Sequence, residues 1–394
     1  MRPLTCLLVP AVVSALSIQL AAQSSVSRQT IDGQEWIILD NGLLRLAVNP
    51  ADRARLEALR YLPGAVELVK RNRVVHEREP LLPPRRQEIP GGAEDHFWGN
   101  VVQWKVDNTR LVRAVDGPSP LVETEGDHRG VVVRRTIALQ PDSLVVDIHV
   151  ALTNATAKAV THSYWFHALP EISRRDWAQQ ADWRLPDEPE RTVVAVTDTP
   201  GLLGRGELLA AGKGVVDMET SSYNTFFAPS QPWMSKWDRG LGFNLAVAFR
   251  MEDLLPEGLL FANRTHDDWP GKNSLEVVFG TRTLPPGSTH EYPLRIIALP
   301  ESGLLLGLSP SWAVTREASG LNLHALRRNP ASTVEVVDRS GRTASRFSVL
   351  ALAPGARHTL DLPEQSMPAQ LQFTTSQDSE TLAIMPPHEP FHTN

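Results

Sequence analysis

Three residues of this sequence combine acid–base chemistry with a position on a predicted strand. In the segment 161–167, His162 and Tyr164 point to one face, because successive strand side chains alternate. An imidazole, with an ordinary pKa of about 6.5, gives or takes a proton at neutral pH. Glu276 lies within an otherwise apolar strand, where a carboxylate without a partner has a raised pKa and can act as a general base. We therefore predict His162, Tyr164 and Glu276 as catalytic residues, with a purely structural role as the alternative for each.

Tryptophan is concentrated in the middle of the chain, with eight of the ten tryptophans between positions 98 and 269. The apolar face of an indole ring stacks on sugar rings, and its N–H group is a donor for hydroxyls. Some of these rings are expected to be ordinary core residues, but three lie in predicted loops beside Pro, Lys and Asp. We predict six substrate-binding residues: His96, Trp98, His167, Trp233, Trp237 and Trp269.

The sequence predicts neither a metal site nor a cofactor. Five residues are candidate metal ligands: His96, His162, His167, Asp267 and Asp268. None of them has the short ligand spacing that makes a metal signal specific. A serine nucleophile elbow, a phosphate-binding glycine loop and a dinucleotide fingerprint are all absent from the sequence.

Charge and composition narrow the class of partner. The 394 residues carry a formal net charge of −6, and Lys and Arg are scattered without a basic stripe. Nucleic acid and anionic membrane surfaces are therefore excluded as main partners. Carbohydrate, as a mono- or oligosaccharide, is the predicted partner, and the oligomeric state stays open.

The N-terminus is typical of a secretory signal peptide. Met1-Arg2 precedes an uncharged apolar stretch, and Ala21-Ala22 supplies the small residues of a cleavage site, so residues 1–22 are expected to be removed. The only cysteine, Cys6, lies inside this segment, so the mature chain forms no disulfide, which suits a bacterial periplasm. No later run of about 18 apolar residues occurs, and we expect an exported protein, periplasmic or extracellular, without a membrane span.

Turn and alternation signals predict an almost entirely β structure. One hairpin is expected around Asp40-Asn41-Gly42 and another, 131–153, around the turn 140–143. The second strand of this second hairpin has apolar residues at period two, which predicts one buried face: Leu144, Val146, Ile148, Val150 and Leu152. The segment 51–59 is a candidate for one or two helical turns, and 174–192 is the best candidate for a long functional loop.

The order of several short motifs resembles that of the galactose mutarotase-like family, also called aldose 1-epimerase-like. The likeness covers residues 35–300 and rests on these motifs: Asn41-Gly42, Asp95-His96 with the following strand to Trp104, the hairpin 131–153, Thr161-His-Ser-Tyr-Trp, and Leu275-Glu276 with Leu284-Pro-Pro-Gly287 and Tyr292. The resemblance implies that His162 is a general acid toward a sugar ring oxygen and Glu276 a general base on the anomeric hydroxyl. It also implies that His96 binds a hydroxyl.

The resemblance further implies an all-β fold with a large antiparallel β-supersandwich. The strand-like segments from Gly320 onward predict a small C-terminal β-sandwich after it. We predict a signal peptide at 1–22, the galactose mutarotase-like supersandwich at 23–300, a connector at 301–319 that could hold a short helix, and the small sandwich at 320–394.

Several positions depart from the family pattern. Phe166-His167 replace an Asn after the histidine strand, Asp95-His96-Phe97-Trp98-Gly99 replace Leu-His-Gly-Gly, and Glu276 is followed by Val-Val rather than Pro-Gln. The leading hypothesis is a secreted carbohydrate-active protein with epimerase-like acid–base chemistry. Two alternatives stay open, namely a noncatalytic carbohydrate-binding protein on the same fold and a polysaccharide lyase that uses His and Tyr.

Overall fold

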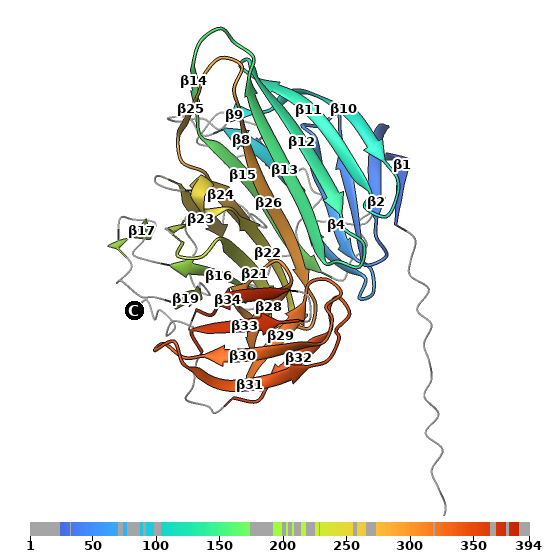
Figure 1. Cartoon of the computed structure of the whole chain (residues 1–394). Coiled ribbons are helices and arrows are strands. Elements are labelled where there is room, and N and C mark those ends of the chain that lie inside the picture. The colour runs from blue at the N-terminus through green and yellow to red at the C-terminus, as the bar shows by residue number, and fades with distance from the viewer. Residues whose placement is uncertain are drawn as a thin grey trace, which may run out of the picture.

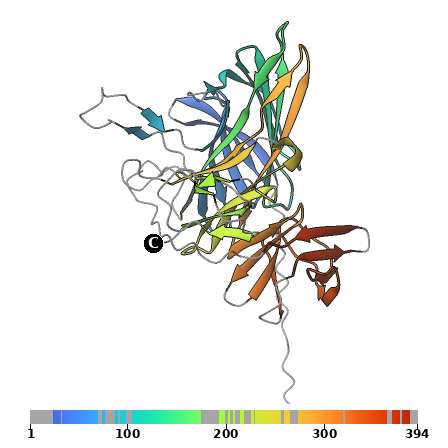
Figure 2. The ribbon, with the colours of Figure 1, turned by 90° about the vertical axis from the view of Figure 1, so that its left-hand side faces the viewer.

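The computed structural model describes residues 24–385, except for 32, 70–73, 77–86, 90–91, 98–103, 174–191, 199–201, 204–206, 209–213, 218–224, 228, 255–257, 265–272, 318–319, 363–367 and 376–377. These residues form antiparallel strands almost throughout, with one short helix, α1 (Met251–Leu254). The prediction of an all-β protein with a large sandwich and a small C-terminal one is confirmed (Figures 1 and 2). No described helix has the length and apolar character needed to cross a membrane.

The first sheet of the large sandwich carries the candidate site. Its order is β1-β2-β3-β4-β5-β15-β24-β23-β20, and β8 pairs with β15, β4 and β9. The strands are β1 (Ser25–Ile31), β2 (Gln34–Asp40), β3 (Leu44–Asn49), β4 (Arg55–Tyr61), β5 (Val66–Val69), β8 (Gly92–Phe97), β9 (Trp104–Lys105), β15 (Tyr164–Ser173), β20 (Thr225–Phe227), β23 (Leu259–Arg264) and β24 (Asn273–Val278).

The second sheet packs against the first and has the order β10-β11-β12-β13-β26-β22-β21-β16-β19. Its strands are β10 (Asp107–Val115), β11 (Leu121–His128), β12 (Val131–Leu139), β13 (Val145–Asn154), β16 (Thr192–Asp198), β19 (Gly214–Asp217), β21 (Trp233–Asp238), β22 (Phe243–Phe249) and β26 (Thr289–Leu299). Three two-stranded ribbons complete this part: β6 (Val74–His76) with β7 (Gln87–Ile89), β14 (Val160–His162) with β25 (Arg282–Leu284), and β17 (Leu202–Leu203) with β18 (Glu207–Leu208).

A continuous apolar core lies between the two sheets. Leu39 and Phe166 from the first sheet and Ile148 and Leu294 from the second belong to it. The predicted buried face of the β13 strand is confirmed, since its alternating apolar side chains are all buried. Burying each large aliphatic side chain contributes about 1.5–3 kcal/mol, so this alternation holds the two sheets together and fixes which side chains point outward.

The two predicted hairpins are confirmed, and one side chain joins them. Gly42 adopts φ 82°, as the tight turn between β2 and β3 requires, and its N–H donates to Asp40 Oδ1 at 2.7 Å. The Asn41 amide donates to the carbonyls of Gln140 and Ser143, in the turn between β12 and β13. Hydrogen bonds therefore connect the turn residues of the two sheets at one end of the sandwich.

The C-terminal sandwich begins earlier than predicted. Its sheets have the orders β27-β28-β29-β32 and β31-β30-β33-β34. Its strands are β27 (Leu304–Leu308), β28 (Trp312–Glu317), β29 (Gly320–Ala325), β30 (Ser332–Val337), β31 (Thr343–Val349), β32 (Arg357–Leu360), β33 (Gln370–Thr374) and β34 (Ser379–Ala383). Segment 301–319 thus contains two strands where a connector was expected. Their residues are mostly buried on both faces, so they lack the period-two alternation that reveals a half-buried strand.

Of two further predicted segments, one has a different secondary structure from that expected and the other lies almost entirely outside the described residues. Segment 51–59 contains the start of β4 instead of a helical turn, because pairing of β4 with β3 overrides local preference. The predicted functional loop 174–192 lies, up to residue 191, outside the described residues.

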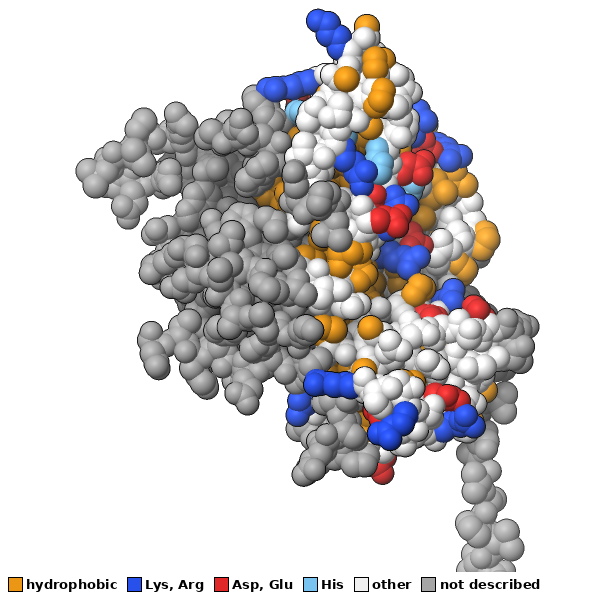
Figure 3. Space-filling view, turned by 60° about the vertical axis from the view of Figure 1, so that its left-hand side comes forward, with side chains coloured by type: hydrophobic (Ala, Val, Ile, Leu, Met, Phe, Trp, Pro, Cys, Tyr) orange, Lys and Arg blue, Asp and Glu red, His pale blue; other side chains and the backbone are white. Residues whose placement is uncertain are grey.

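The two sandwiches share a second apolar core. Val145 and Ile297 on the outer face of the second sheet pack with Leu305, Trp312 and Phe373 of the C-terminal sandwich. In Figures 1 and 2 the C-terminal sandwich, in orange and red, lies against one end of the large one. The visible described surface in Figure 3 mixes acidic and basic side chains, without a large patch of one sign.

Candidate functional site

Three neighbouring strands bring two carboxylates and two imidazoles to one face of the first sheet. In the register of β8, β15 and β24, His167 lies opposite Glu94 on one side and opposite Glu276 on the other. His96 follows Glu94 by two positions and therefore lies on the same face. Asp95, Phe166 and the neighbours of Glu276 point the opposite way, into or beside the core between the sheets. We call Glu94, His96, His167 and Glu276 the histidine–carboxylate face.

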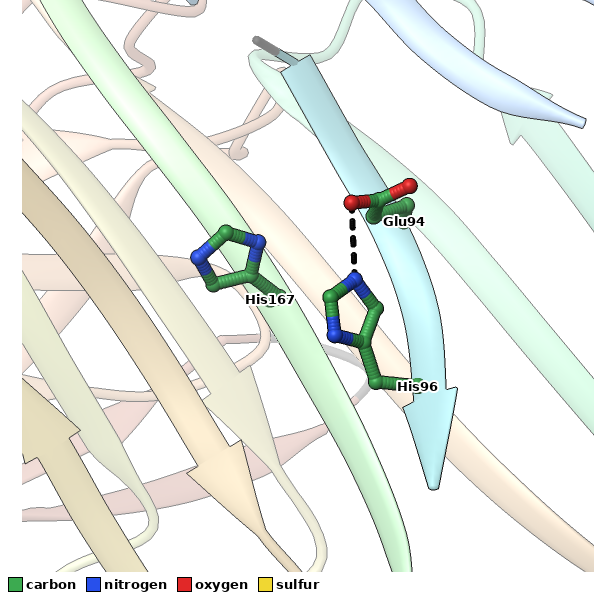
Figure 4. Close-up of side chains that lie close together, drawn as sticks. All are labelled: Glu94, His96 and His167. Atoms are coloured by element: carbon green, nitrogen blue, oxygen red, sulfur yellow. Dashed lines mark ion pairs between the residues drawn. The ribbon is translucent and has the colours of Figure 1, made fainter. Parts of the chain in front are cut away.

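Each imidazole of this face has a carboxylate beside it. Nε2 of His96 is 2.7 Å from Oε1 of Glu94, and Nε2 of His167 is 3.3 Å from Oε1 of Glu276. The two imidazole rings are 5.0 Å apart between centroids. Figure 4 shows the His167 ring beside the Glu94–His96 pair, with one ring nitrogen facing that pair.

The surroundings of the face are closed to solvent and order the side chains. The rings of Trp165 and His96 pack in a T-shaped arrangement, with centroids 5.4 Å apart. Arg55 donates from Nη2 to Oε2 of Glu94 at 3.1 Å and also pairs with Asp52 at 3.4 Å. All four residues of the face are buried. Because buried ionic groups are expensive unless paired, these contacts fix the orientation of each group.

Two polar atoms of the face have no hydrogen-bond partner among the described residues. They are Oε2 of Glu276 and Nδ1 of His167, and both are shielded from water. Such atoms are rare in folded proteins, since an unsatisfied buried polar group costs about 1–3 kcal/mol. They mark this face as a place where a ligand would complete the hydrogen bonding.

Tyr164 lies on the core-facing side of the first sheet and His162 lies in the separate ribbon of β14 and β25, so the structure does not bring them to Glu276. The register partner of His162 is Arg282, and its Nε2 lies 3.3 Å from the Tyr292 hydroxyl. Burial, with the nearby His290, Arg282 and His128, lowers the pKa of His162 to about 4. His162 is therefore neutral at neutral pH.

Tyr164 is part of a buried polar link between the sheets. Its hydroxyl donates to Oδ1 of Asp95 at 2.6 Å, and Arg135 from β12 lies 3.6 Å from the same carboxylate. Burial, with Asp95 as the next cause, raises the pKa of Tyr164 well above its ordinary value. This environment is that of a structural hydrogen bond. The predicted catalytic roles of His162 and Tyr164 stay predictions.

The predicted sugar-binding tryptophans have separate locations. Trp233 is 1% exposed and belongs to the core shared with the C-terminal sandwich, because the segment expected as a loop is strand β21. Trp237 is partly buried, with the Arg239 guanidinium 5.4 Å from its ring centroid. Trp98 and Trp269 lie outside the described residues, as do the metal-ligand candidates Asp267 and Asp268.

Sequence reasoning found three members of the face and missed Glu94. His96, His167 and Glu276 were predicted site residues, although His167 was assigned to binding only. The available signal was the spacing Glu94-x-His96, which places both side chains on one face of a strand. The pairing of His167 with Glu276 needed the strand order, which no local pattern encodes.

The comparisons with known proteins concern the fold. No family model and no curated protein matches the sequence. The structure is similar to a galactose mutarotase-like protein from Clostridium acetobutylicum, at 10% identity over 71% of this chain and 99% of that chain, with a TM-score of 0.48. A galactose mutarotase-like protein from Lactobacillus casei is similar at 11% identity over 67% of this chain and 99% of that chain, with a TM-score of 0.45.

A TPR-domain containing protein from Parabacteroides distasonis is also similar, at 16% identity over 67% of this chain and 47% of that chain, with a TM-score of 0.50. At these identities the structural likeness bears on the fold, and the chemistry has to be argued from the residues of this chain.

Proposed function

We propose that this protein is a carbohydrate-active enzyme that performs epimerase-like acid–base chemistry on a sugar at the histidine–carboxylate face. One observation carries the proposal. Glu276 is 1% exposed, His167 holds its Oε1, and its Oε2 has no partner among the described residues. A sugar hydroxyl is a suitable partner for this oxygen, because it donates a hydrogen bond and can give up its proton to a carboxylate.

In the proposed reaction Glu276 is the general base and His167 positions it. Glu276 takes the anomeric hydroxyl proton on Oε2, the C1–O1 bond becomes a double bond, and the bond from C1 to the ring oxygen breaks. The ring oxygen takes up a proton from a water molecule on the side of Glu94 and His96, where a group must stabilise its developing charge. Closure on the other face of C1 reverses these transfers. General acid–base catalysis of this kind contributes about 10²–10⁴-fold.

Carbohydrate as the substrate class has support from two directions. The names of two structural neighbours, galactose mutarotase-like proteins, denote sugar chemistry for those proteins. In this chain, Trp165 offers an aromatic side chain beside the imidazoles. The particular sugar depends on hydroxyl contacts and is to be found by screening.

The test is anomer exchange measured by NMR across a panel of reducing mono- and oligosaccharides. The wild-type protein is expected to exceed the spontaneous exchange rate for at least one sugar, and Glu276→Gln is expected to lose at least 10²-fold. The matched control is Glu291→Gln, since Glu291 also lies 3.3 Å from a histidine, His149, but on the exposed surface. His162→Ala tests the sequence-based choice of general acid in the same assay.

Three results would overturn the proposal. Exchange at the spontaneous rate with every sugar, together with measurable glycan binding, would leave a noncatalytic binding protein. Release of an ultraviolet-absorbing unsaturated product from a polysaccharide would favour a lyase. If Glu276→Gln exchanges anomers as fast as the wild type, the histidine–carboxylate face does not catalyse the reaction.

We also infer export, from the signal-like residues 1–22, which lie outside the described residues. The sequence of this segment has the charged start, apolar centre and small-residue end of a signal peptide. Its removal from the mature chain is the measurable consequence of export.

A further inference from the structure

We propose that Glu94, His96 and His167 bind a divalent transition-metal ion, with Zn²⁺ the ion of best fit. The inference deepens the proposed function, on which its catalytic meaning rests, by naming the group that stabilises the sugar ring oxygen. One potential ligand atom from each of the three residues lies within 4.8 Å of the other two, and all three residues are buried. Two imidazoles and one carboxylate are a donor set that holds Zn²⁺ at catalytic sites and leaves one position open.

The types of donor atom also narrow the choice of metal ion. Imidazole nitrogen suits zinc and its first-row neighbours, whereas Ca²⁺ and Mg²⁺ prefer sites made of oxygen atoms. No thiolate is at hand, because the only cysteine is Cys6 in the predicted signal peptide. A borderline ion such as Zn²⁺ therefore fits better than Cu⁺ or an alkaline-earth ion.

The contacts of His167 provide an independent observation. Its Nε2 lies 3.3 Å from a Glu276 oxygen, and in the tautomer that donates its N–H there the lone pair lies on Nδ1. Nδ1 has no hydrogen-bond partner among the described residues, and the residue is 6% exposed. A carboxylate behind a histidine, with the other ring nitrogen unprotonated, is the usual outer-shell arrangement of a metal-binding histidine.

Glu94 is oriented in the same manner. Arg55 holds its Oε2 at 3.1 Å, which turns Oε1 toward His96 and His167. With metal–ligand bonds of about 2.0–2.1 Å in tetrahedral geometry, the Glu94 and His96 ligand atoms would be about 3.3 Å apart. They are 2.7 Å apart in this structure, so these two atoms would separate by about 0.6 Å on binding.

Such an ion would act directly beside the proposed base. The position left open by three protein ligands can take a sugar oxygen, whose developing negative charge the ion stabilises. Glu276 keeps its Oε2 for the hydroxyl proton, and His167 serves both as ligand and as the group that orients Glu276. Coordination of the ion and orientation of Glu276 use different ring nitrogens of His167, so neither role prevents the other.

The test uses the full chain, stripped with a chelator and titrated with ZnCl₂ alone by isothermal calorimetry, with bound metal counted by plasma mass spectrometry. Wild-type protein is expected to bind one equivalent, to melt at a higher temperature with zinc, and to give the visible bands of a tetrahedral site with Co²⁺. His96→Phe keeps the ring shape and is expected to bind at least 10²-fold more weakly. The control is His149→Phe, an exposed strand histidine that also has a glutamate 3.3 Å away.

The outcomes separate the metal site from the enzyme. Failure of the wild type to bind zinc at micromolar concentration, or equal binding by folded His96→Phe, would overturn the metal site while leaving anomer exchange to be judged on its own. If His96→Phe loses zinc binding and His149→Phe keeps it, the metal site is supported even if the protein accelerates anomer exchange of no sugar. Circular dichroism of each variant distinguishes loss of a ligand from loss of the fold.

Discussion

His167 and Glu276 face each other across β15 and β24, with Nε2 of the histidine 3.3 Å from Oε1 of the glutamate. The surface pair His149 and Glu291 has the same separation, but both side chains are about half exposed. Surface pairs of that kind contribute about 0–1 kcal/mol. A buried ion pair offsets its desolvation cost only if its polar atoms are satisfied. Oε2 of Glu276 has no hydrogen-bond partner among the residues that the structure describes, which points to a ligand.

The backbone at Gly92 controls where Glu94 and His96 lie. Gly92 has φ +81°, and a Cβ there would lie 2.1 Å from the Leu56 carbonyl oxygen, in the contact between β8 and β4. Gly92→Ala is expected to lower the free energy of unfolding by roughly 2–4 kcal/mol, through backbone strain and overpacking. Urea unfolding measures this loss.

Gly33→Ala is the matched control, since Gly33 has φ +76° but no atom within 4 Å of the added Cβ. It is expected to cost about 1 kcal/mol, from the left-handed backbone alone. Equal losses in the two variants would show that β8 does not need the close approach to Leu56.

The Tyr164 hydroxyl is expected to matter for stability. Tyr164→Phe leaves Asp95 without its 2.6 Å donor in the core and should lower the free energy of unfolding by about 1–3 kcal/mol. Tyr61→Phe is the control, because the Tyr61 hydroxyl makes no hydrogen bond to a described residue. Unchanged stability combined with lost anomer exchange would support the catalytic role predicted for Tyr164 from sequence.

The pKa of His162 gives a pH dependence with a defined sign. Its pKa is about 4 in the folded protein, through burial and nearby positive groups, against 6.5 as the ordinary value. Below pH 6.5 His162 binds a proton in the unfolded chain but stays neutral in the folded chain until the pH approaches 4. The free energy of unfolding therefore falls as the pH drops toward 4. Between pH 7 and 5 this amounts to about 2 kcal/mol.

Urea unfolding at pH 7, 6 and 5 checks this expectation. The pKa of His324 in the C-terminal sandwich is also lowered to about 4, by burial and Arg357, so wild type must be compared with His162→Asn. The variant should lose less stability on acidification than the wild type. An identical pH dependence would mean that folding does not lower the pKa of His162.

Removal of residues 1–22 is expected when the gene is expressed in a bacterium with a secretion system. Intact-mass analysis of the periplasmic fraction should find a chain that begins at Gln23. Ala22→Arg, which replaces the small residue at the cleavage site, is expected to leave the segment attached. Recovery of the uncleaved wild-type chain from the cytoplasm would contradict export.

Much of the fold was accessible from local patterns. The turn at Gly42, the hairpin of β12 and β13 and the alternation along β15 follow from turn chemistry and period-two spacing. The start of the C-terminal sandwich was not accessible, because β27 and β28 are buried on both faces and show no alternation. Trp233 was misplaced for a similar reason, since the polar residues around it suggested a loop where there is a strand.

The sequence by itself determined which chemical groups the site could contain and which of them share a strand face. His96, His167 and Glu276 were predicted from their types and positions, and alternation already separated His167 from His162. Only the tertiary structure decided that β8, β15 and β24 are neighbours, and with that which histidine meets Glu276. The physical reason is that strand order results from burying both sheets' apolar faces together, a property of the whole chain.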